Sequence, residues 1–142
     1  MCGLPGAGKT TLAKQLEIDR PALRLTPDEW MGPLFGTGDD EPKRAVVEAL
    51  MWDVAARALR LGVDVILDFG FWGREERAGF RERAAALGAR TDVKFLDVPR
   101  DELIRRVVER NAALPPDTFR VEPTDLGLWF DLFEAPTVDE LG

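Results

Sequence analysis

The chain alternates between short, almost continuous apolar runs and longer segments in which apolar residues recur at helical spacing. The apolar runs 22–25, 63–70 and 92–98 predict buried parallel strands, because a strand that is covered on both faces needs few polar positions. Helices are predicted after the glycine-rich start and over 43–61, 74–87, 101–111 and 124–133. The alternation predicts an α/β fold whose parallel sheet carries helices on both faces.

Two local patterns refine this prediction. Thr26 and Glu29 have the spacing of a capping box, and Pro27 suits the first position of the helix that follows. In the helix 43–61, which Gly62 is expected to end, the apolar positions at helical spacing predict the buried face. These positions are Val46, Ala49, Leu50, Val54 and Leu61. With 142 residues, the chain is expected to form a single domain over 1–142.

The first dozen residues contain the strongest signal for function. The run "GLPGAGKTT" satisfies G-x-x-x-x-G-K-[ST], the P-loop, in which successive backbone N–H groups surround a phosphate at the N-terminus of a helix. Lys9 is expected to reach the outer phosphates and Thr10 to hold Mg²⁺. A glycine turn that only caps a helix is the alternative, and the eight-residue pattern disfavours it. The expected nucleotide-binding residues are Gly3, Pro5, Gly6, Ala7, Gly8, Lys9, Thr10 and Thr11.

A P-loop follows a hydrophobic strand, yet only Met1 and Cys2 precede Gly3. We expect that the true chain begins several residues upstream; the other interpretation is a fragment whose central strand is missing. A last strand after "FEAPTVDELG" is a second candidate for a missing element.

Composition narrows the possible chemistry. Hydrophobic residues make up 45% and charged residues 32% of the chain, as in an ordinary globular protein without a membrane span. The chain has no histidine, so acid–base and metal-binding roles fall to Asp, Glu, Lys and Arg. A single cysteine excludes an internal disulfide and fits a reducing cytoplasm, where we expect the protein. The net charge of −7 argues against a nucleic-acid partner.

Two carboxylates follow predicted strands, where ligands bind in parallel α/β sheets. Asp68 ends the run "VILD" and is expected to support the P-loop Mg²⁺; the alternative is a hydrogen bond to a neighbouring loop. Asp28 is expected to orient or deprotonate the acceptor hydroxyl; the alternative is an acidic residue that favours a helix dipole. We expect both to contribute to the acceptor site, beside the aromatic residues Phe69, Phe71 and Trp72.

Two groups of arginines complete the candidate site. Arg106 and Arg110 share one helical face and could close over the transferred phosphoryl group; salt bridges such as Glu102 to Arg106 are the alternative. Arg74 and Arg77 could bind an anionic part of the substrate, or could instead pair with Glu75 and Glu76.

Six motifs follow one another along the chain: "GLPGAGKTTLA", "TPDEW", "VILDFGFW", the R-x-x-R of Arg74 and Arg77, "LDVP" and "RRVVERN". In this order they resemble the small P-loop kinases of the AAA_33 type. Relatives of that type include zeta toxin, chloramphenicol phosphotransferase and the kinase domain of polynucleotide kinase. The resemblance extends from residue 3 to about residue 134. It implies a nucleoside-kinase-like three-layer sandwich, a short lid over about 111–122, and ATP- and Mg²⁺-dependent phosphoryl transfer to a hydroxyl.

The resemblance also implies roles for single residues. Lys9 and Thr10 would bind phosphate and Mg²⁺, Asp28 would be the base, and Arg106 or Arg110 would belong to the lid. Polynucleotide kinases have an arginine three residues after the base, where this chain has Met31.

A small-molecule kinase is therefore the leading hypothesis, with ATP and a hydroxyl acceptor as its partners. The alternatives are a 5′-hydroxyl nucleic-acid kinase and a nucleotide-binding switch or ATPase module that has no acceptor. The sequence does not indicate an oligomeric state.

Overall fold

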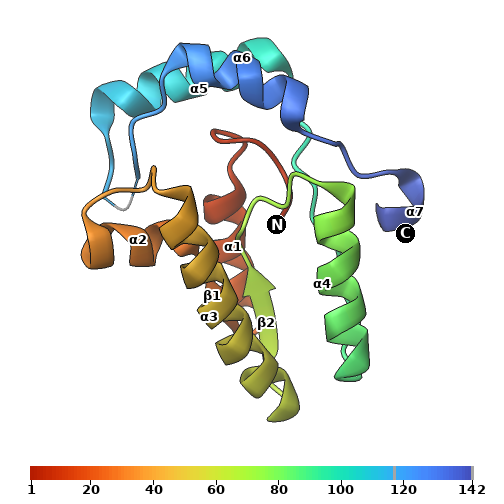
Figure 1. The fold of residues 1–142 in the computed structure, drawn as a ribbon. Helices are drawn as coiled ribbons and strands as arrows, with labels where there is room; N and C mark the ends of the chain where they lie inside the picture. Colours follow the sequence, from red (N-terminus) through yellow and green to blue (C-terminus); the bar gives the residue numbers. More distant parts are fainter. Residues whose placement is uncertain (117, 142) are drawn as a thin grey trace.

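The computed structural model describes residues 1–116 and 118–141 (Figure 1). Asp117, within the predicted lid, and Gly142, at the end of the predicted domain, lie outside the described residues. The elements in chain order are α1 (Lys9–Asp19), β1 (Ala22–Leu25), α2 (Pro27–Phe35), α3 (Glu41–Arg60), β2 (Asp64–Leu67), α4 (Arg74–Ala86), α5 (Arg100–Ala113), α6 (Pro123–Leu132) and α7 (Val138–Leu141).

The two strands pair in parallel, with Ala22 opposite Asp64 and Leu25 opposite Leu67. Helix α3 packs against both strands and α1 packs against β1. Helices α5 and α6 contact each other and lie across the top of the molecule in Figure 1, above the red segment that leads into α1. The predicted α/β arrangement with a parallel sheet is confirmed. No helix in the described residues is both long and apolar enough to cross a membrane.

The third predicted strand, 92–98, is reduced to an isolated bridge in which Phe95 pairs in parallel with Cys2. Cys2 N donates to Lys94 O at 2.8 Å, and Leu96 N donates to Cys2 O at 3.1 Å. On its other side Cys2 bridges Gly70. Met1 to Gly3 therefore lie between β2 and 94–96, but three residues are too few to pair with the whole run.

Beside Met1, a cavity of about 840 Å³ lies between β2 and the segment 93–94. The cavity is lined by Met1, by Val65 and Leu67 of β2, and by Val93 and Lys94. The Met1 ammonium is buried at its end and donates to Leu67 O at 2.7 Å. Burial lowers the pKa of this ammonium to about 6, although the nearby Asp68 carboxylate opposes the shift.

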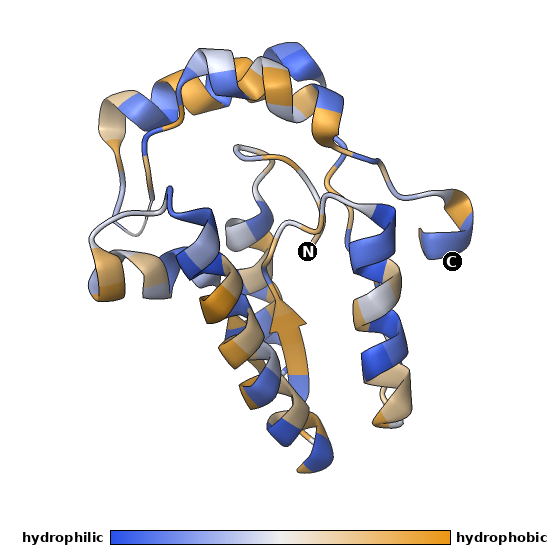
Figure 2. Cartoon of the chain, in the orientation of Figure 1, coloured by the Kyte–Doolittle hydropathy of each residue, from blue (hydrophilic) through white to orange (hydrophobic). Residues whose placement is uncertain are grey.

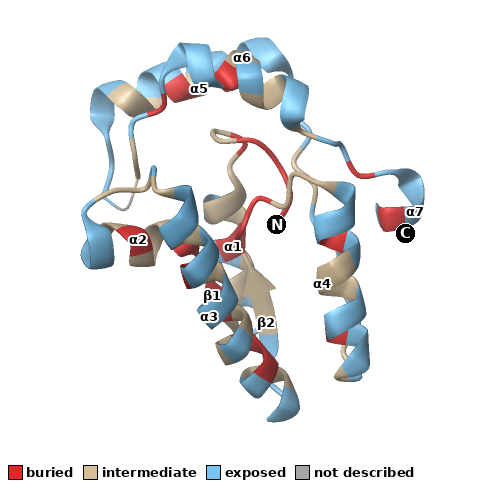
Figure 3. Cartoon of the chain, viewed as in Figure 1, coloured by how far each residue is buried: buried red, intermediate tan, exposed pale blue. Residues whose placement is uncertain are grey.

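The main core lies between the sheet, α2 and α3 (Figure 3) and contains Leu25, Met31, Val47, Met51, Ala55 and Phe69. The predicted inner face of α3 is largely wrong, because Val46 and Leu50 are 58% and 53% exposed while Val47 and Met51 are buried. Of the predicted positions, Val54 does pack against the core. Apolar residues stand side by side at 46–47 and 50–51, so spacing alone could not distinguish the two faces. In Figure 2 hydrophobic and hydrophilic segments alternate along α3, whereas much of α4 is hydrophilic.

The predicted capping box at the start of α2 is also wrong. Thr26 is the N-cap, but its side chain makes no capping hydrogen bond. Its hydroxyl instead donates to Asp68 at 3.1 Å and accepts from Arg24 at 2.6 Å. Glu29 pairs with Arg24 at 2.8 Å. The side chains of Thr26 and Glu29 are therefore bonded to Arg24 and Asp68, which links α2 to the ends of the two strands.

Candidate active site

The glycine-rich segment forms a loop that ends where α1 begins. Gly6 and Gly8 have φ angles of 84° and 93°, in the left-handed region where a side chain would be strained. A Cβ on Gly6 would also lie 2.9 Å from Val107 Cγ2 of α5. Gly8 is the N-cap of α1, and its carbonyl accepts the first helical hydrogen bond from Leu12 N at 3.0 Å. The loop thus presents the positive end of α1 to the space beneath α5.

A cavity of about 960 Å³ opens at this helix end. Of the predicted nucleotide-binding residues, Pro5, Gly6, Gly8, Lys9, Thr10 and Thr11 line it. Gly3 and Ala7 belong to the same loop but are buried and do not line the cavity. The Lys9 ammonium donates to Leu4 O at 2.9 Å. Burial lowers the pKa of Lys9 to about 8, and the nearby carboxylates of Asp68 and Asp28 oppose the shift, so this lysine is charged at neutral pH.

Thr10 and Asp68 meet at the base of the cavity. Thr10 Oγ1 donates to Asp68 Oδ2 at 2.7 Å, and Asp68 is only 4% exposed. Its other oxygen, Oδ1, is buried and has no hydrogen-bond partner among the described residues. An uncompensated carboxylate oxygen beside a hydroxyl suits Mg²⁺, which takes oxygen ligands and is commonly held by one or two protein groups plus substrate phosphates. The residues present therefore fit this metal.

Asp28 lies in the first turn of α2 and lines the same cavity. Its Oδ1 accepts a 2.7 Å hydrogen bond from Arg44 Nη1 of α3, and Arg44 Nε donates to Glu48 Oε1 at 3.2 Å. The side chains of Arg44 and Glu48 are each 22% exposed, against 42% for Asp28. Burial raises the pKa of Glu48 to about 7, despite the opposing charge of Arg44.

The two lid arginines differ in their surroundings. Arg106 lines the cavity but pairs with Glu102 at 2.7 Å, as in the alternative considered from the sequence. Arg110 also lines the cavity, and its Nε is buried with no hydrogen-bond partner among the described residues. Burial lowers the pKa of Arg110, and the Asp28 carboxylate opposes that shift. Arg105 is turned outward, where it binds Glu102 and Glu109.

Aromatic side chains form the remaining wall of the cavity. Phe69, Phe71 and Trp72 line it as expected. Phe71 is held at a φ of 49°, a strained value for a residue with a side chain. From the other side, the Phe119 ring lies against the Gly38 backbone, where an added Cβ would come within 2.3 Å of the ring.

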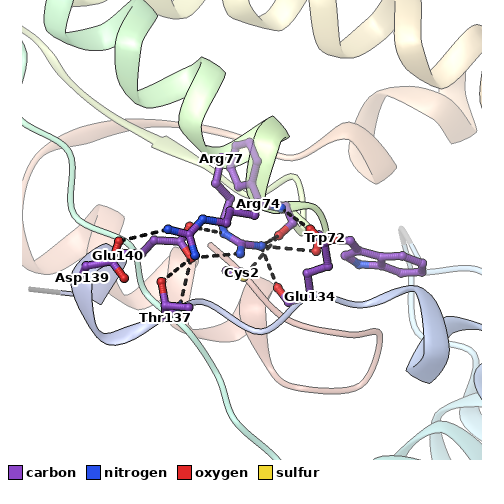
Figure 4. A network of polar contacts seen from close by, with 9 residues as sticks. Cys2, Trp72, Arg74, Arg77, Glu134, Thr137, Asp139 and Glu140 are labelled. Atoms are coloured by element: carbon purple, nitrogen blue, oxygen red, sulfur yellow. Dashed lines mark hydrogen bonds and ion pairs between the residues drawn. The ribbon is translucent and has the colours of Figure 1, made fainter.

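Arg74 and Arg77 do not line this cavity. They belong instead to the polar network in Figure 4. Arg77 is 3% exposed and forms a two-point ion pair with Glu140 of α7, at 2.7 and 3.1 Å. Its Nη1 also donates to Phe71 O and Glu134 O. Arg74 pairs with Asp139 at 3.3 Å. This placement corrects the expected role in substrate binding, because both arginines attach the end of the chain to the start of α4.

Sequence reasoning missed three contributors to this region: Arg44, Glu48 and Glu140. Arg44 and Glu48 have the i, i+4 spacing of a helical ion pair. This spacing is the sequence signal that could have identified them. Glu140 is separated from Arg77 by 63 residues, and no local pattern indicates that pairing.

A glycine-rich loop at a helix N-terminus, with its threonine hydroxyl bonded to an aspartate beyond the adjacent strand, defines a P-loop nucleotide-binding protein. The family model AAA_33, described as an AAA domain, matches residues 1–136. The chain therefore belongs to the AAA_33 family, as the motifs predicted.

Proposed function

We propose that this protein is a kinase that transfers the γ-phosphoryl group of ATP to a hydroxyl of a small molecule. The observation that supports this most is the position of Asp28, which lines the same cavity as Lys9 and Thr10 of the P-loop. Asp28 Oδ2 accepts no hydrogen bond from the residues that the structure describes, so one carboxylate oxygen is available to an acceptor. As part of this proposal we retain the three-layer sandwich and the cytoplasmic location expected from the sequence.

In the proposed reaction the acceptor oxygen bonds to the γ-phosphorus as the bond from that phosphorus to the β–γ bridging oxygen breaks. The hydroxyl proton passes to Asp28, and ADP leaves. The P-loop amides and Lys9 bind the phosphates. Thr10 and Asp68 would hold Mg²⁺, which when bound neutralises charge on the phosphate oxygens. We assign the lid contact to Arg110, because its buried Nε lacks a protein partner while Arg106 is paired with Glu102.

A small molecule fits the acceptor side better than a nucleic-acid end. Met31, at the position where polynucleotide kinases have an arginine, is fully buried in the core and does not line the cavity. The cavity wall beyond Asp28 includes Glu41, Glu48 and Glu76. These carboxylates would repel a phosphate backbone.

The direct test incubates the protein with Mg²⁺ and ATP labelled on its γ-phosphate, together with a pool of cellular metabolites freed of macromolecules. We expect label to appear in a small organic phosphate, and to depend on Lys9. Label that appears only as inorganic phosphate would favour the switch or ATPase alternative. Label transferred only to an oligonucleotide with a 5′-hydroxyl would favour the nucleic-acid kinase.

A further inference from the structure

Arg44 connects two carboxylates that belong to different helices. Its Nη1 donates to Asp28 Oδ1 of α2 at 2.7 Å, while its Nε donates to Glu48 Oε1 of α3 at 3.2 Å. All three side chains line the cavity that contains the P-loop. Asp28, Arg44 and Glu48 therefore form one continuous polar chain, which we call the Asp28 support.

The helices that hold the Asp28 support are fixed to one another. Met31 of α2 and Val47 and Met51 of α3 are at most 1% exposed and pack in one core cluster. Arg44 lies one turn before Val47, so its Cα is anchored by buried neighbours rather than by a mobile loop. A side chain on such a rigid base can hold a second side chain at a defined position.

The two oxygens of Asp28 have different environments as a result. Oδ1 is held by the Arg44 guanidinium, whereas Oδ2 accepts nothing from the described residues. Asp28 is also the most exposed member of the support, with 42% of its side chain accessible against 22% for each of the other two. The support thus fixes one oxygen of the carboxylate and leaves the other available to a ligand in the cavity.

We propose that Arg44 is a positioning residue, which holds Asp28 Oδ1 so that Oδ2 faces the attacking hydroxyl, and that Glu48 holds Arg44 in that task. This inference rests on the proposed function. The planar guanidinium suits the role because it donates from fixed directions to both carboxylates at once, which a lysine ammonium on a flexible stem does not. Glu48 has no other ion-pair partner among the described residues. Burial raises the pKa of this carboxyl, Glu76 and Glu41 add to the rise and Arg44 opposes it, so the ionised form depends on Arg44.

The test is a double-mutant cycle between Asp28 and Arg44, read out by hydrolysis of Mg-ATP with water as the acceptor. Water serves as the probe because the same carboxylate would orient it. We expect Arg44→Met to slow turnover at saturating Mg-ATP by roughly 10- to 100-fold, the scale expected for a misplaced catalytic group. The Kd for Mg-ATP should stay within about twofold, since Arg44 acts on the acceptor side.

The cycle separates positioning from a general structural effect. If Arg44 acts through Asp28, then Arg44→Met should cause no further loss in an Asp28→Asn background. Arg44→Lys should recover part of the rate, and Glu48→Gln should cause a smaller loss than Arg44→Met. The exposed Arg57 of α3 supplies the matched control, Arg57→Met, which should change neither rate nor affinity.

Several outcomes would overturn the inference. These are an unchanged rate in Arg44→Met, additive losses in the double variant, full recovery by Arg44→Lys, or a parallel loss of rate and Mg-ATP affinity. Slow turnover in Asp28→Asn with a normal rate in Arg44→Met would reject the positioning role and leave the proposed function standing. An unchanged rate in Asp28→Asn would reject the catalytic role of Asp28, and the positioning role with it.

Discussion

Thr10 Oγ1 lies 2.7 Å from Asp68 Oδ2 and donates a hydrogen bond to it across 58 residues of sequence. This bond joins the first turn of α1 to the residue directly after β2, so the phosphate-binding loop and the sheet edge share one fixed point. The same carboxylate accepts from Thr26, at the start of α2. Asp68 therefore sets the relative positions of the P-loop and of the helix that bears Asp28.

The first prediction concerns Lys9. Lys9→Ala removes a buried ammonium that lines the phosphate side of the cavity, a charge-assisted contact worth about 1.5–3 kcal/mol. Mg-ATP affinity measured by calorimetry should fall by about one to two orders of magnitude. Lys43→Ala is the control, because Lys43 is 49% exposed, contacts Asp40 and the Phe35 ring, and does not line the cavity. Equal affinities in Lys9→Ala and the wild type would remove the P-loop from nucleotide binding.

The second prediction distinguishes a kinase from a switch. Asp28→Asn keeps the size of the side chain and should leave Mg-ATP affinity almost unchanged. Loss of the base should lower phosphoryl transfer by about 10²–10⁴-fold. If Asp28 only favours the helix N-terminus, Asn would cap nearly as well and transfer would be normal. Turnover, Mg-ATP affinity and melting temperature, measured on the same preparations, give the answer; a folded Asn variant with normal transfer would contradict the proposed mechanism.

Local patterns predicted the loop, helices α1 to α6 and the first two strands because each depends on neighbours in sequence, but they did not predict α7. The P-loop glycines and the apolar run that ends at Asp68 specify their own backbone, and 22–25 is a strand as predicted. The face of α3 could not be predicted, because two apolar stripes compete and only the packed sheet selects the one with Val47 and Met51.

The errors at the site have a similar cause, because local sequence does not determine contacts between distant segments. Which residues line the cavity follows from the ends of predicted elements, so Lys9, Thr10, Asp28 and Asp68 are brought together as expected. Which charge pairs with which depends on distant segments. Arg77 was expected to face a ligand and instead meets Glu140, a partner that only the three-dimensional path of the chain supplies.

The third prediction tests the contact between Phe119, in the loop after α5, and Gly38, in the segment before α3. In Gly38→Ala the new Cβ would clash with the Phe119 ring, so the loop after α5 should be displaced. We expect faster amide exchange over 118–122 and slower phosphoryl transfer. Replacing Phe119 by Leu in the same chain should relieve part of the effect. Gly79→Ala is the matched control: Gly79 has open space around it within α4, so the change should only stabilise the helix by about 1 kcal/mol.

The fourth prediction concerns the buried pair of Arg77 and Glu140. Glu140→Gln leaves a guanidinium uncompensated in a buried position and should lower the free energy of unfolding by about 3 kcal/mol, near the low end for such pairs because Arg77 keeps its carbonyl partners. Arg77→Met with Glu140→Leu removes both charges and should recover most of this loss. Denaturant unfolding of the wild type and the two variants gives the comparison, and a double variant less stable than Glu140→Gln would contradict this account.

The ion pair between Arg77 and Glu140 also predicts how the stability of the fold changes at acidic pH. The hydrogen bond from Arg77 lowers the pKa of Glu140 to about 2, below the value near 4.3 of an unfolded glutamate. A depressed carboxyl pKa stabilises the fold fully above about pH 4.3, and that stabilisation disappears as the pH falls toward 2. The stability difference between wild type and Glu140→Gln should therefore be constant near neutral pH and shrink over this range. A difference that stays constant down to pH 2 would show that Glu140 is not ionised in the fold.

The fifth prediction uses the cavity beside Met1. Val65 of β2 and Val93 line this cavity from opposite sides, and Cys2 already bridges Phe95 in parallel. Adding four or five β-branched residues before Met1 should extend this pairing and remove the buried ammonium, which raises both the melting temperature and Mg-ATP affinity. An extension of equal length made of Gly and Ser is the control. Equal gains from both extensions would show that strand pairing is not the cause.

The attachment of α7 to Arg77 has a consequence for the order in which the protein matures during synthesis. Arg77 leaves the ribosome well before Glu140, and until then the guanidinium beneath Phe71 lacks the carboxylate that neutralises it. The cavity wall at Phe71 and Trp72 therefore gains its last support only when the final residues of this sequence emerge. This wall of the cavity is therefore complete only after 138–141 have left the ribosome and α7 has paired with Arg77.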